Sequence, residues 1–358
     1  MNKKLSTGLP YAILLVLFVA APFLIKTTTV LQSMVKIMLA IIGAVSLRTI
    51  SLSGNMSFAH GAFVGVGAYT AGVLAKTLGM SMWLTIPLGA LMALFLGLLT
   101  GWPFARLRTI YFCMGSMFMG QAIAQLIKGL KITGGARGMV QIPSMKKALE
   151  GVTNALGWQE INSRYFFFLI IVVVSLICMY RFEHSRIGWT LKALAQSPEV
   201  AASIGVNEKF YRLMSVGVGC FFAGLAGACY AHFNTTLTPD DYAMSMTLWL
   251  IMDMMIGGSG SFLGPILGAI IIEGINALPA IFSALTGVIK STGFVSFSRW
   301  LGTNSAYTPY VTAVILLIMA YFVPGGLVSI PTMIRNSFAK RRENKAEEME
   351  GGNDNAVA

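Results

Sequence analysis

The sequence predicts an all-α fold, a polytopic bundle of roughly ten transmembrane helices within a range of about 8 to 12. Three observations support this prediction. Apolar residue types make up 56% of the 358 residues. They are gathered in runs long enough to cross a bilayer. Charged types make up only 11%, too few to cover a soluble globule of this size. The composition therefore excludes a soluble enzyme and a disordered chain.

The apolar runs are bounded by charged or turn-forming residues, and each has the composition expected of a span. They cover residues 10–25, 34–50, 56–75, 82–104, 110–126, 165–180, 211–233, 244–256, 262–279 and 307–323. The first run follows Lys3 and Lys4, as in a signal peptide, but it is long and lacks a small-x-small cleavage site. We interpret it as a retained span. The run 244–256 is short and ends in glycines, which is typical of a helix that breaks inside the membrane.

The net charge of +12 indicates topology rather than nucleic-acid binding, because Lys and Arg lie between the apolar runs and at the chain ends. An even number of spans puts both termini on one side, and most Lys and Arg residues fall there, which predicts an N-in, C-in orientation. We expect a membrane domain over 1–330 and a charged, disordered cytoplasmic tail over 331–358. Polar stretches at about 128–164, outside, and about 181–210, inside, interrupt the spans.

The inner polar stretch, 181–210, carries its own helical pattern. Ile187, Leu191 and Leu194 recur at helical spacing. Ser197, followed by proline and an acid, is typical of an N-cap, and it predicts a short helix over 198–204 that ends at Gly205. Two short amphipathic helices outside the membrane form either a docking surface for a soluble partner or a linker that lies on the lipid headgroups.

Five segments in order carry a family resemblance. They are SLSGNMSFAHGAFVGVGAYTAG (51–72), LRTIYF with TGGARGM (107–139), SRIGWTLKALAQSPEVAASIGVNEKFYRLMSVGVGCFFAGLAGACYAHF (185–233), IGGSGSFLGPILGA (256–269) and VPGGLV (323–328). With them, roughly 31–330 resembles the permeases of ABC importers for branched-chain amino acids, and more narrowly the LivM type of the LivH/LivM family. The resemblance implies the ABC-importer permease fold in a bacterial plasma membrane.

The resemblance also implies a function and partners. The chain would form half of a translocation pathway for Leu, Ile, Val or related amino acids; urea, short amides and other small solutes stay open as substrates. The partners would be a homologous LivH-type permease, two P-loop ATPases of the LivG/LivF type and an outer amino-acid-binding protein. ATP and Mg would be hydrolysed by those partners. The sequence contains no P-loop pattern, so we expect no cofactor and no enzyme activity in this chain.

The resemblance assigns contacts with partners to two polar stretches. The contacts with the ATPases fall on Arg186, Gly188, Glu199, Ala201, Ala202 and Gly205. The outer mouth, where the binding protein docks, falls on a predicted tight turn of Thr133, Gly134, Gly135 and Gly138. The alternative for the second set is a loop that only connects two helices. Asp240 and Asp241, in another outer loop, are candidates to meet basic residues of a docked protein.

The candidates for the translocation pathway lie in two glycine-rich regions. They are Asn55, Ser57, His60, Gly61, Gly65, Asp253, Gly258 and Ser261. The glycines expose backbone to a pore or, alternatively, let helices pack closely. A weak internal symmetry aligns Gly54–Phe58 with Gly258–Phe262, as in transporters that place one broken helix from each half at the site.

Asp253 lies inside an apolar run, where a carboxylate is expensive. It pairs with a second permease, contacts a substrate ammonium, or lies near the membrane interface. A rival interpretation of the whole chain is a secondary transporter that works alone. It would require intramembrane ion ligands, which are scarce here, and it leaves the inner polar stretch unexplained.

Overall fold

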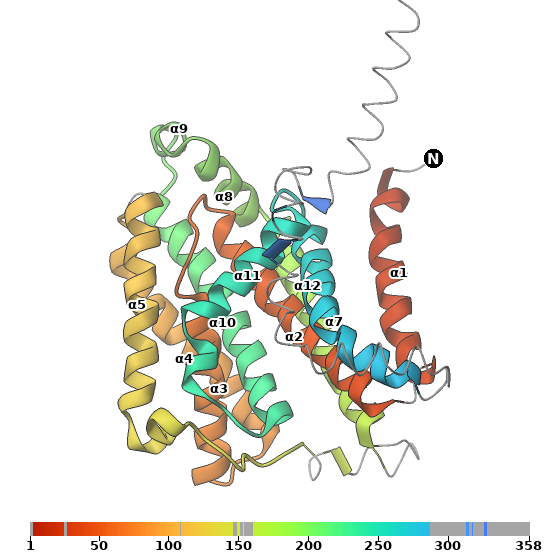
Figure 1. Cartoon of the computed structure of the whole chain (residues 1–358). Coiled ribbons are helices and arrows are strands. Elements are labelled where there is room, and N and C mark those ends of the chain that lie inside the picture. Colours follow the sequence, from red (N-terminus) through yellow and green to blue (C-terminus); the bar gives the residue numbers. More distant parts are fainter. Residues whose placement is uncertain are drawn as a thin grey trace, which may run out of the picture.

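The structure is a computed structural model that describes residues 3–24, 27–107, 109–145, 149–150, 153, 160–286, 313–314, 317 and 326–327. In these parts of the chain the regular elements are helical, and the β pairing is an isolated bridge between Met139 and Leu237. The helices are α1 (Lys3–Leu24), α2 (Thr28–Ser51), α3 (His60–Thr77), α4 (Met82–Phe104), α5 (Thr109–Gly129), α7 (Glu160–Glu183), α8 (Arg186–Gln196), α9 (Pro198–Ser203), α10 (Glu208–Asn234), α11 (Met244–Gly257) and α12 (Leu263–Thr286), with short 3-10 turns η1 (Lys131–Thr133), η2 (Gly135–Arg137) and η3 (Pro239–Tyr242) (Figure 1).

Five of the described helices, α2, α4, α5, α7 and α10, are long and apolar enough to cross a membrane. Shorter apolar helical segments lie in α1, α11 and α12. An all-α membrane architecture is therefore confirmed, while the total of about ten spans and the orientation stay predictions. The predicted run 307–323 and the tail 331–358 lie outside the described residues.

The predicted span 56–75 begins before the helix that the structure shows there. The run 56–75 was expected to be continuous, but α3 starts at His60, and the chain from Leu52 to Ala59 is not helical. Gly54 adopts φ +79°, a left-handed conformation that ends helical geometry. Asn55 and Ser57 consequently lie in a buried loop that precedes the helix.

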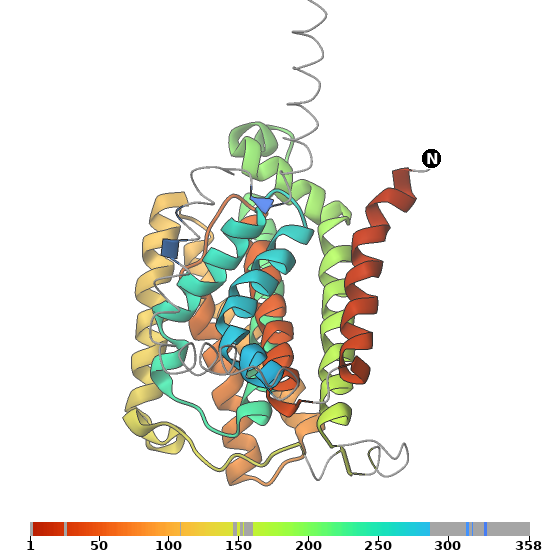
Figure 2. The same ribbon diagram turned by 45° about the vertical axis from the view of Figure 1, so that its right-hand side comes forward.

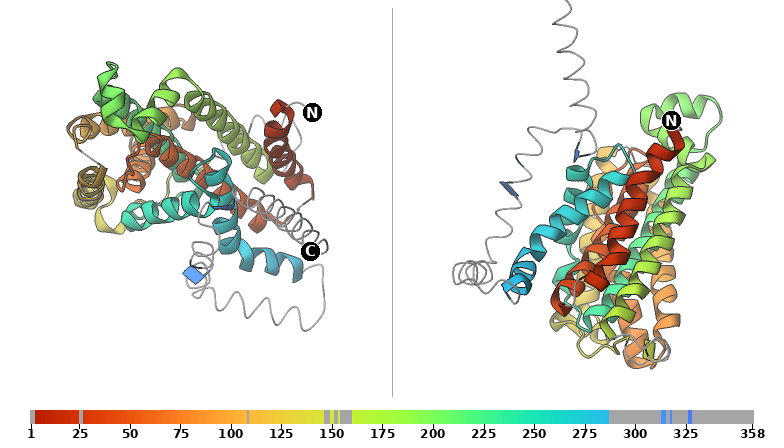
Figure 3. Two further views of the ribbon diagram at one scale, coloured as in Figure 1. Left: turned by 90° about the horizontal axis from the view of Figure 1, so that it is seen from above. Right: turned by 90° about the vertical axis from the view of Figure 1, so that its right-hand side faces the viewer.

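Helix α10 lies at the centre of the bundle and packs against α2, α3 and α4. Its contact with α3 is made close by paired glycines, because a Cβ on Gly67 would lie 2.1 Å from the Gly224 carbonyl oxygen. Helix α2 continues the packing toward α7 and α12, and α11 lies against α12. Viewed from above, α1 stands at the edge of the bundle beside α7, with α5 at the opposite edge (Figure 3).

The two ends of the bundle carry different short elements. Helices α8 and α9 project at one end, beyond the ends of α7 and α10; we call this the α8–α9 end (Figure 2). The turns η1 and η2 lie at the opposite end (Figure 1). Each predicted set of partner-contacting residues thus occupies its own end of the bundle.

Candidate functional site

The inner polar stretch folds into the two short helices that the sequence predicts. The Ser185 hydroxyl caps α8 by accepting the Gly188 N–H at 3.4 Å, and the apolar face of Leu191 and Leu194 is fully buried. Helix α9 starts at Pro198, but the expected cap is wrong in one detail: the Ser197 side chain accepts no backbone N–H. Gly205 ends the pair at φ +86°.

The residues assigned to ATPase contact divide into two groups. Arg186, Glu199, Ala202 and Gly205 are exposed at the α8–α9 end, whereas Gly188 and Ala201 are buried and hold the helices in place.

Sequence reasoning missed a second feature of this surface. Trp189, Val200 and Ile204 are exposed by 62%, 62% and 77%. Large apolar side chains grouped outside the bundle are typical of a protein interaction surface.

Helix α8 rests on the loop that precedes α3. A Cβ placed on Gly54 would lie 3.2 Å from the Ala195 Cα, so this glycine meets α8 with almost no space between the backbones. The last turn of α8 therefore contacts the first helix break directly.

A buried ion network ties α8 to the second break. Arg48, near the end of α2, forms a two-pronged ion pair with Glu183, at the end of α7; the Arg48 Nη2 to Glu183 Oε1 distance is 3.0 Å. The Lys192 Nζ of α8 lies 2.9 Å from the same carboxylate. The Arg48 Nε donates to the Ser259 carbonyl oxygen at 3.1 Å. Three helices, α2, α7 and α8, thus meet at one carboxylate, and Arg48 extends the network to the loop before α12.

In the sequence, Arg48 is only one of the positive charges that predict membrane orientation, and no pattern singles out Glu183. Both side chains are nearly inaccessible, with relative exposures of 3% and 4%. The sequence did contain a signal for this pair. An acid lies at the end of one apolar run and an arginine at the end of another, and buried charges require partners.

The two segments aligned by internal symmetry are both helix breaks. Gly54 precedes α3 at φ +79°, and Gly258 precedes α12 at φ +103°. Ser261 caps α12 by accepting the Gly264 N–H at 3.2 Å. The backbone therefore supports the alignment, and the role of these segments in a pathway stays a prediction.

The glycines at the start of α3 are used for packing. The Gly61 N–H donates to the Thr247 hydroxyl of α11 at 2.8 Å. A Cβ on Gly65 would lie 2.7 Å from the Tyr242 Cβ. Close contact with α11 and η3 is the role that the described contacts give these two glycines.

Three pathway candidates keep buried polar atoms without hydrogen-bond partners in the described structure. Both side-chain polar atoms of Asn55 are unpaired. The His60 Nε2 pairs with the Ser46 hydroxyl at 2.8 Å, but its Nδ1 has no partner. Asp253 is 2% exposed, and its Oδ1 is unpaired. Such groups are rare in folded proteins and mark positions that use water, a ligand or a moving partner.

The opposite end is a compact turn, as predicted. The Thr133 hydroxyl donates to the Ile127 carbonyl at 2.6 Å, and Gly134, Gly135 and Gly138 have φ of +84°, +64° and +77°.

The chain segments around this turn are tied together. The Met139 N–H donates to the Leu237 carbonyl at 2.9 Å, which joins this turn to the loop before η3. Asp240 of η3 pairs with Lys128 of α5. Burial raises the pKa of the nearby Tyr242 hydroxyl well above its usual range.

Similarity searches connect this architecture to known transport proteins. A family model described as "branched-chain amino acid transport system / permease component" matches residues 29–324. The high-affinity branched-chain amino acid transport system permease protein LivM of Escherichia coli K12 is 28% identical over 282 residues, covering 72% of this chain and 65% of that protein. LivM of Salmonella typhimurium is 27% identical over 279 residues, with the same coverage of 72% and 65%.

A further relative carries a different name. The autoinducer 2 import system permease protein LsrD of Salmonella typhi is 27% identical over 243 residues, covering 64% of this chain and 69% of that protein. The chain spans 65% of the length of the LivM proteins it matches. No solved structure matches.

Proposed function

The chain belongs to the family of permease components of branched-chain amino acid transport systems, and from this premise we propose that it is a transmembrane subunit of an ABC importer. It would form half of the translocation pathway for Leu, Ile, Val or related amino acids. The similarity to LivM favours these substrates over the autoinducer of the LsrD system, urea or short amides. As a transport subunit it would perform no catalysis itself.

The proposed assembly contains three kinds of partner. A homologous permease completes the pathway, two P-loop ATPases supply energy by hydrolysing ATP with Mg, and an outer binding protein delivers the solute. The α8–α9 end would face the cytoplasm of a bacterium, and the turn of η1 and η2 would face the binding protein. The α8–α9 end is the richer in Lys and Arg outside the apolar runs, which supports this orientation.

The single observation that carries the proposal is the connection of α8 to both helix breaks. The pair α8–α9 stands outside the bundle and exposes Trp189, Val200 and Ile204, a surface suited to a groove in a soluble partner. Its inner side contacts Gly54 directly and reaches the Ser259 carbonyl through Lys192, Glu183 and Arg48.

These connections suggest a mechanism of energy coupling. When the ATPases close, they displace α8. The movement of α8 shifts both helix breaks, which lie directly before α3 and α12. Such a movement would shift these two helices relative to α2 and α10, which is the kind of rearrangement that alternating access requires. The unpaired groups of Asn55, His60 and Asp253 are our candidates for contact with the solute or with water along the opened path.

A substitution at Gly205 tests the coupling. Proline cannot adopt φ +86°, and it would remove the N–H that donates to the Ala202 carbonyl at 3.0 Å. We expect Gly205→Pro to abolish leucine uptake and solute-stimulated ATPase activity while the chain still inserts into the membrane. Gly79→Pro is the matched control, because Gly79 also has positive φ, +62°, and nothing near its Cβ position, but lies between α3 and α4. Normal uptake with Gly205→Pro contradicts the coupling role.

Purification of the tagged chain in mild detergent tests the assembly. Two P-loop ATPases and a second permease in stoichiometric amounts are the expected companions. A monomer or homodimer without an ATPase would contradict the importer and support a secondary transporter. In that case Asp253 and Glu273, the two acids within α11 and α12, would become the leading site candidates.

A further inference from the structure

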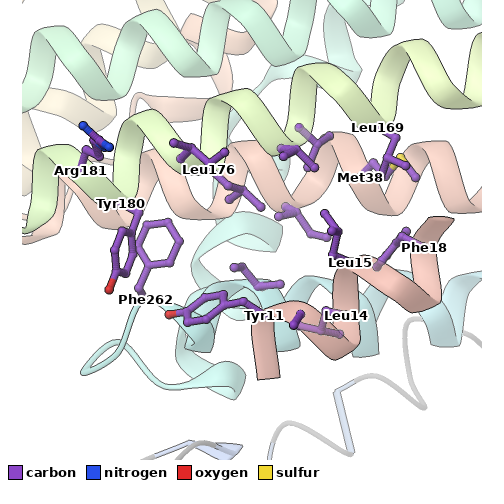
Figure 4. A pocket seen from close by; sticks show the side chains of 16 residues that line it. Tyr11, Leu14, Leu15, Phe18, Met38, Leu169, Leu176, Tyr180, Arg181 and Phe262 are labelled. Atoms are coloured by element: carbon purple, nitrogen blue, oxygen red, sulfur yellow. The ribbon is translucent and has the colours of Figure 1, made fainter. Parts of the chain in front are cut away.

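An apolar cavity of about 750 Å³ lies between α1 and the body of the bundle (Figure 4). Its walls come from α1, α2, α7 and the start of α12. The volume falls in the range of sites that hold a ligand of considerable size. The Tyr165 hydroxyl donates to the Phe18 carbonyl at 2.8 Å, so α1 is anchored to α7 at one end of this cavity, and none of the described residues fills the space between them.

The chemistry of the cavity changes from one end to the other. Phe18, Met38 and Leu169 line the end nearer the middle of the bundle, and Tyr11 and Tyr180 lie toward the other (Figure 4). Arg181 follows Tyr180 at that end, on the other side of the α7 ribbon. Arg181 is the charged residue of the lining.

The guanidinium of Arg181 is available for a ligand. Arg181 is exposed and has no hydrogen-bond or ion-pair partner among the described residues. The nearby acid Glu183 is already paired with Arg48 and Lys192, so it leaves this guanidinium free.

The length of the cavity matches one leaflet of a bilayer. The twelve steps from Leu169 to Arg181 rise about 18 Å along α7 at 1.5 Å per residue. Half of a hydrocarbon core of about 30 Å is about 15 Å. Arg181 lies in the last turn of α7, next to α8, at the level where headgroups meet water. Tyrosines beside it fit the same level, because their rings favour the membrane interface.

We propose that this cavity binds one acyl chain of an anionic phospholipid from the leaflet at the α8–α9 end, with the lipid phosphate held by Arg181. The apolar walls exclude a zwitterionic amino acid, which would lose its hydration there without finding partners. An anionic phospholipid satisfies both ends, since its chain removes the walls from water and its phosphate, which no headgroup cation neutralises, pairs with the guanidinium. The lipid then fills the space between α1 and α7. The proposal requires membrane insertion but not the importer role.

Native mass spectrometry of the full chain tests the site. The chain is released gently from nanodiscs that contain phosphatidylglycerol and phosphatidylcholine with identical acyl chains. We expect one retained phosphatidylglycerol per chain, and a photoactivatable acyl analogue should cross-link to α1 or to the 169–177 segment of α7. Arg181→Gln should lower this retention about fivefold. Leu176→Trp, which fills the cavity, should abolish both retention and cross-linking.

Two matched controls separate the site from general effects. Arg106→Gln removes another exposed arginine, and Ile170→Trp adds the same bulk to an exposed position of α7, 63% accessible. Both should retain the lipid as the unchanged chain does. Equal retention of the two lipids by the unchanged chain, or unchanged retention after Arg181→Gln or Leu176→Trp, overturns the proposal. Cross-linking of the acyl analogue only outside α1 and the 169–177 segment also overturns it.

Discussion

Two regions of the molecule each contain a buried carboxylate. In one region the carboxylate has ion-pair partners, and in the other it has an oxygen without a partner. Glu183, at the α8–α9 end, is 4% exposed and has Arg48 and Lys192 as partners. Asp253, within α11, is 2% exposed, and its Oδ1 has no partner in the described structure. The same chemical group is therefore fixed in one region and left unsatisfied in the other.

The difference indicates two different uses of a buried acid. A paired carboxylate holds the surrounding segments at defined distances, because either partner alone would be a costly buried charge. A buried acid with an unpaired oxygen gains no stabilising contact through that atom, so it is a candidate for contact with water, a solute or a moving partner. Replacing each acid by its amide should separate the two uses.

The largest effect is expected from Glu183→Gln. It would leave the Arg48 guanidinium buried without a counter-charge, which costs about 3–5 kcal/mol. The Tm of the detergent-solubilised chain should fall strongly, and transport should be lost. Glu199→Gln, the same change at an exposed position, is the stability control and should alter the free energy of unfolding by less than about 0.5 kcal/mol. A Tm equal to that of the control would show that the pair holds nothing together.

The double variant Arg48→Met with Glu183→Met sharpens this result. An apolar pair of similar volume should restore most of the lost stability. It cannot restore the link from Lys192 to the Ser259 carbonyl, so solute-stimulated ATPase activity of the assembled transporter should stay low. Full activity in this stable variant would contradict the transmission role of the network.

The next effect in size is expected from Gly258→Ala. Gly258 has φ +103°, which an L side chain adopts only at a cost of about 1–3 kcal/mol. The strain would also displace the Ser259 carbonyl that accepts from Arg48 Nε. We expect a lower Tm, measured by thermal denaturation, together with reduced uptake. Gly274→Ala, in α12 with open space at its Cβ position, serves as the control.

The order of the helices could be predicted from the sequence because it follows from local patterns. Apolar runs gave α2, α4, α5, α7 and α10, and the spacing of Ile187, Leu191 and Leu194 gave α8. The late start of α3 could not be predicted, since it depends on a loop stabilised by contacts with α8.

The candidate site was less predictable than the helices for the same reason. Arg48 and Glu183 lie 135 residues apart, and no local pattern records that they meet. The contact between Gly54 and Ala195 also joins residues that lie far apart in the sequence. The resemblance to a family predicted where a coupling segment would lie, but the network beneath it emerges only from the tertiary structure.

A smaller effect, opposite in sign, is expected from Asp253→Asn. The amide removes a buried carboxylate that gains nothing from its surroundings, so stability should stay the same or rise by up to about 1 kcal/mol. Thermal denaturation of this variant beside Glu183→Gln measures the contrast directly. A fall in Tm comparable to that of Glu183→Gln would mean that Asp253 has a partner. Unchanged leucine uptake by the stable variant would remove Asp253 from contact with the solute ammonium.

The smallest effect on stability is expected from Lys192→Gln. This variant tests whether Lys192 belongs to the ion network that stabilises the fold. The Lys192 side chain is 32% exposed, so its ion pair with Glu183 should contribute less than about 1 kcal/mol to stability. The Arg48–Glu183 pair survives the change, and the fold should be nearly unaffected. The connection between α8 and the second break is lost, however, and solute-stimulated ATPase activity should fall more than the Tm does. Lys209→Gln, at an exposed lysine of α10 at the same end, is the charge-matched control. If the solute-stimulated ATPase activity is the same in both variants, α8 acts on the bundle through Gly54 alone. The buried carboxylate then serves only to hold α2 and α7 together.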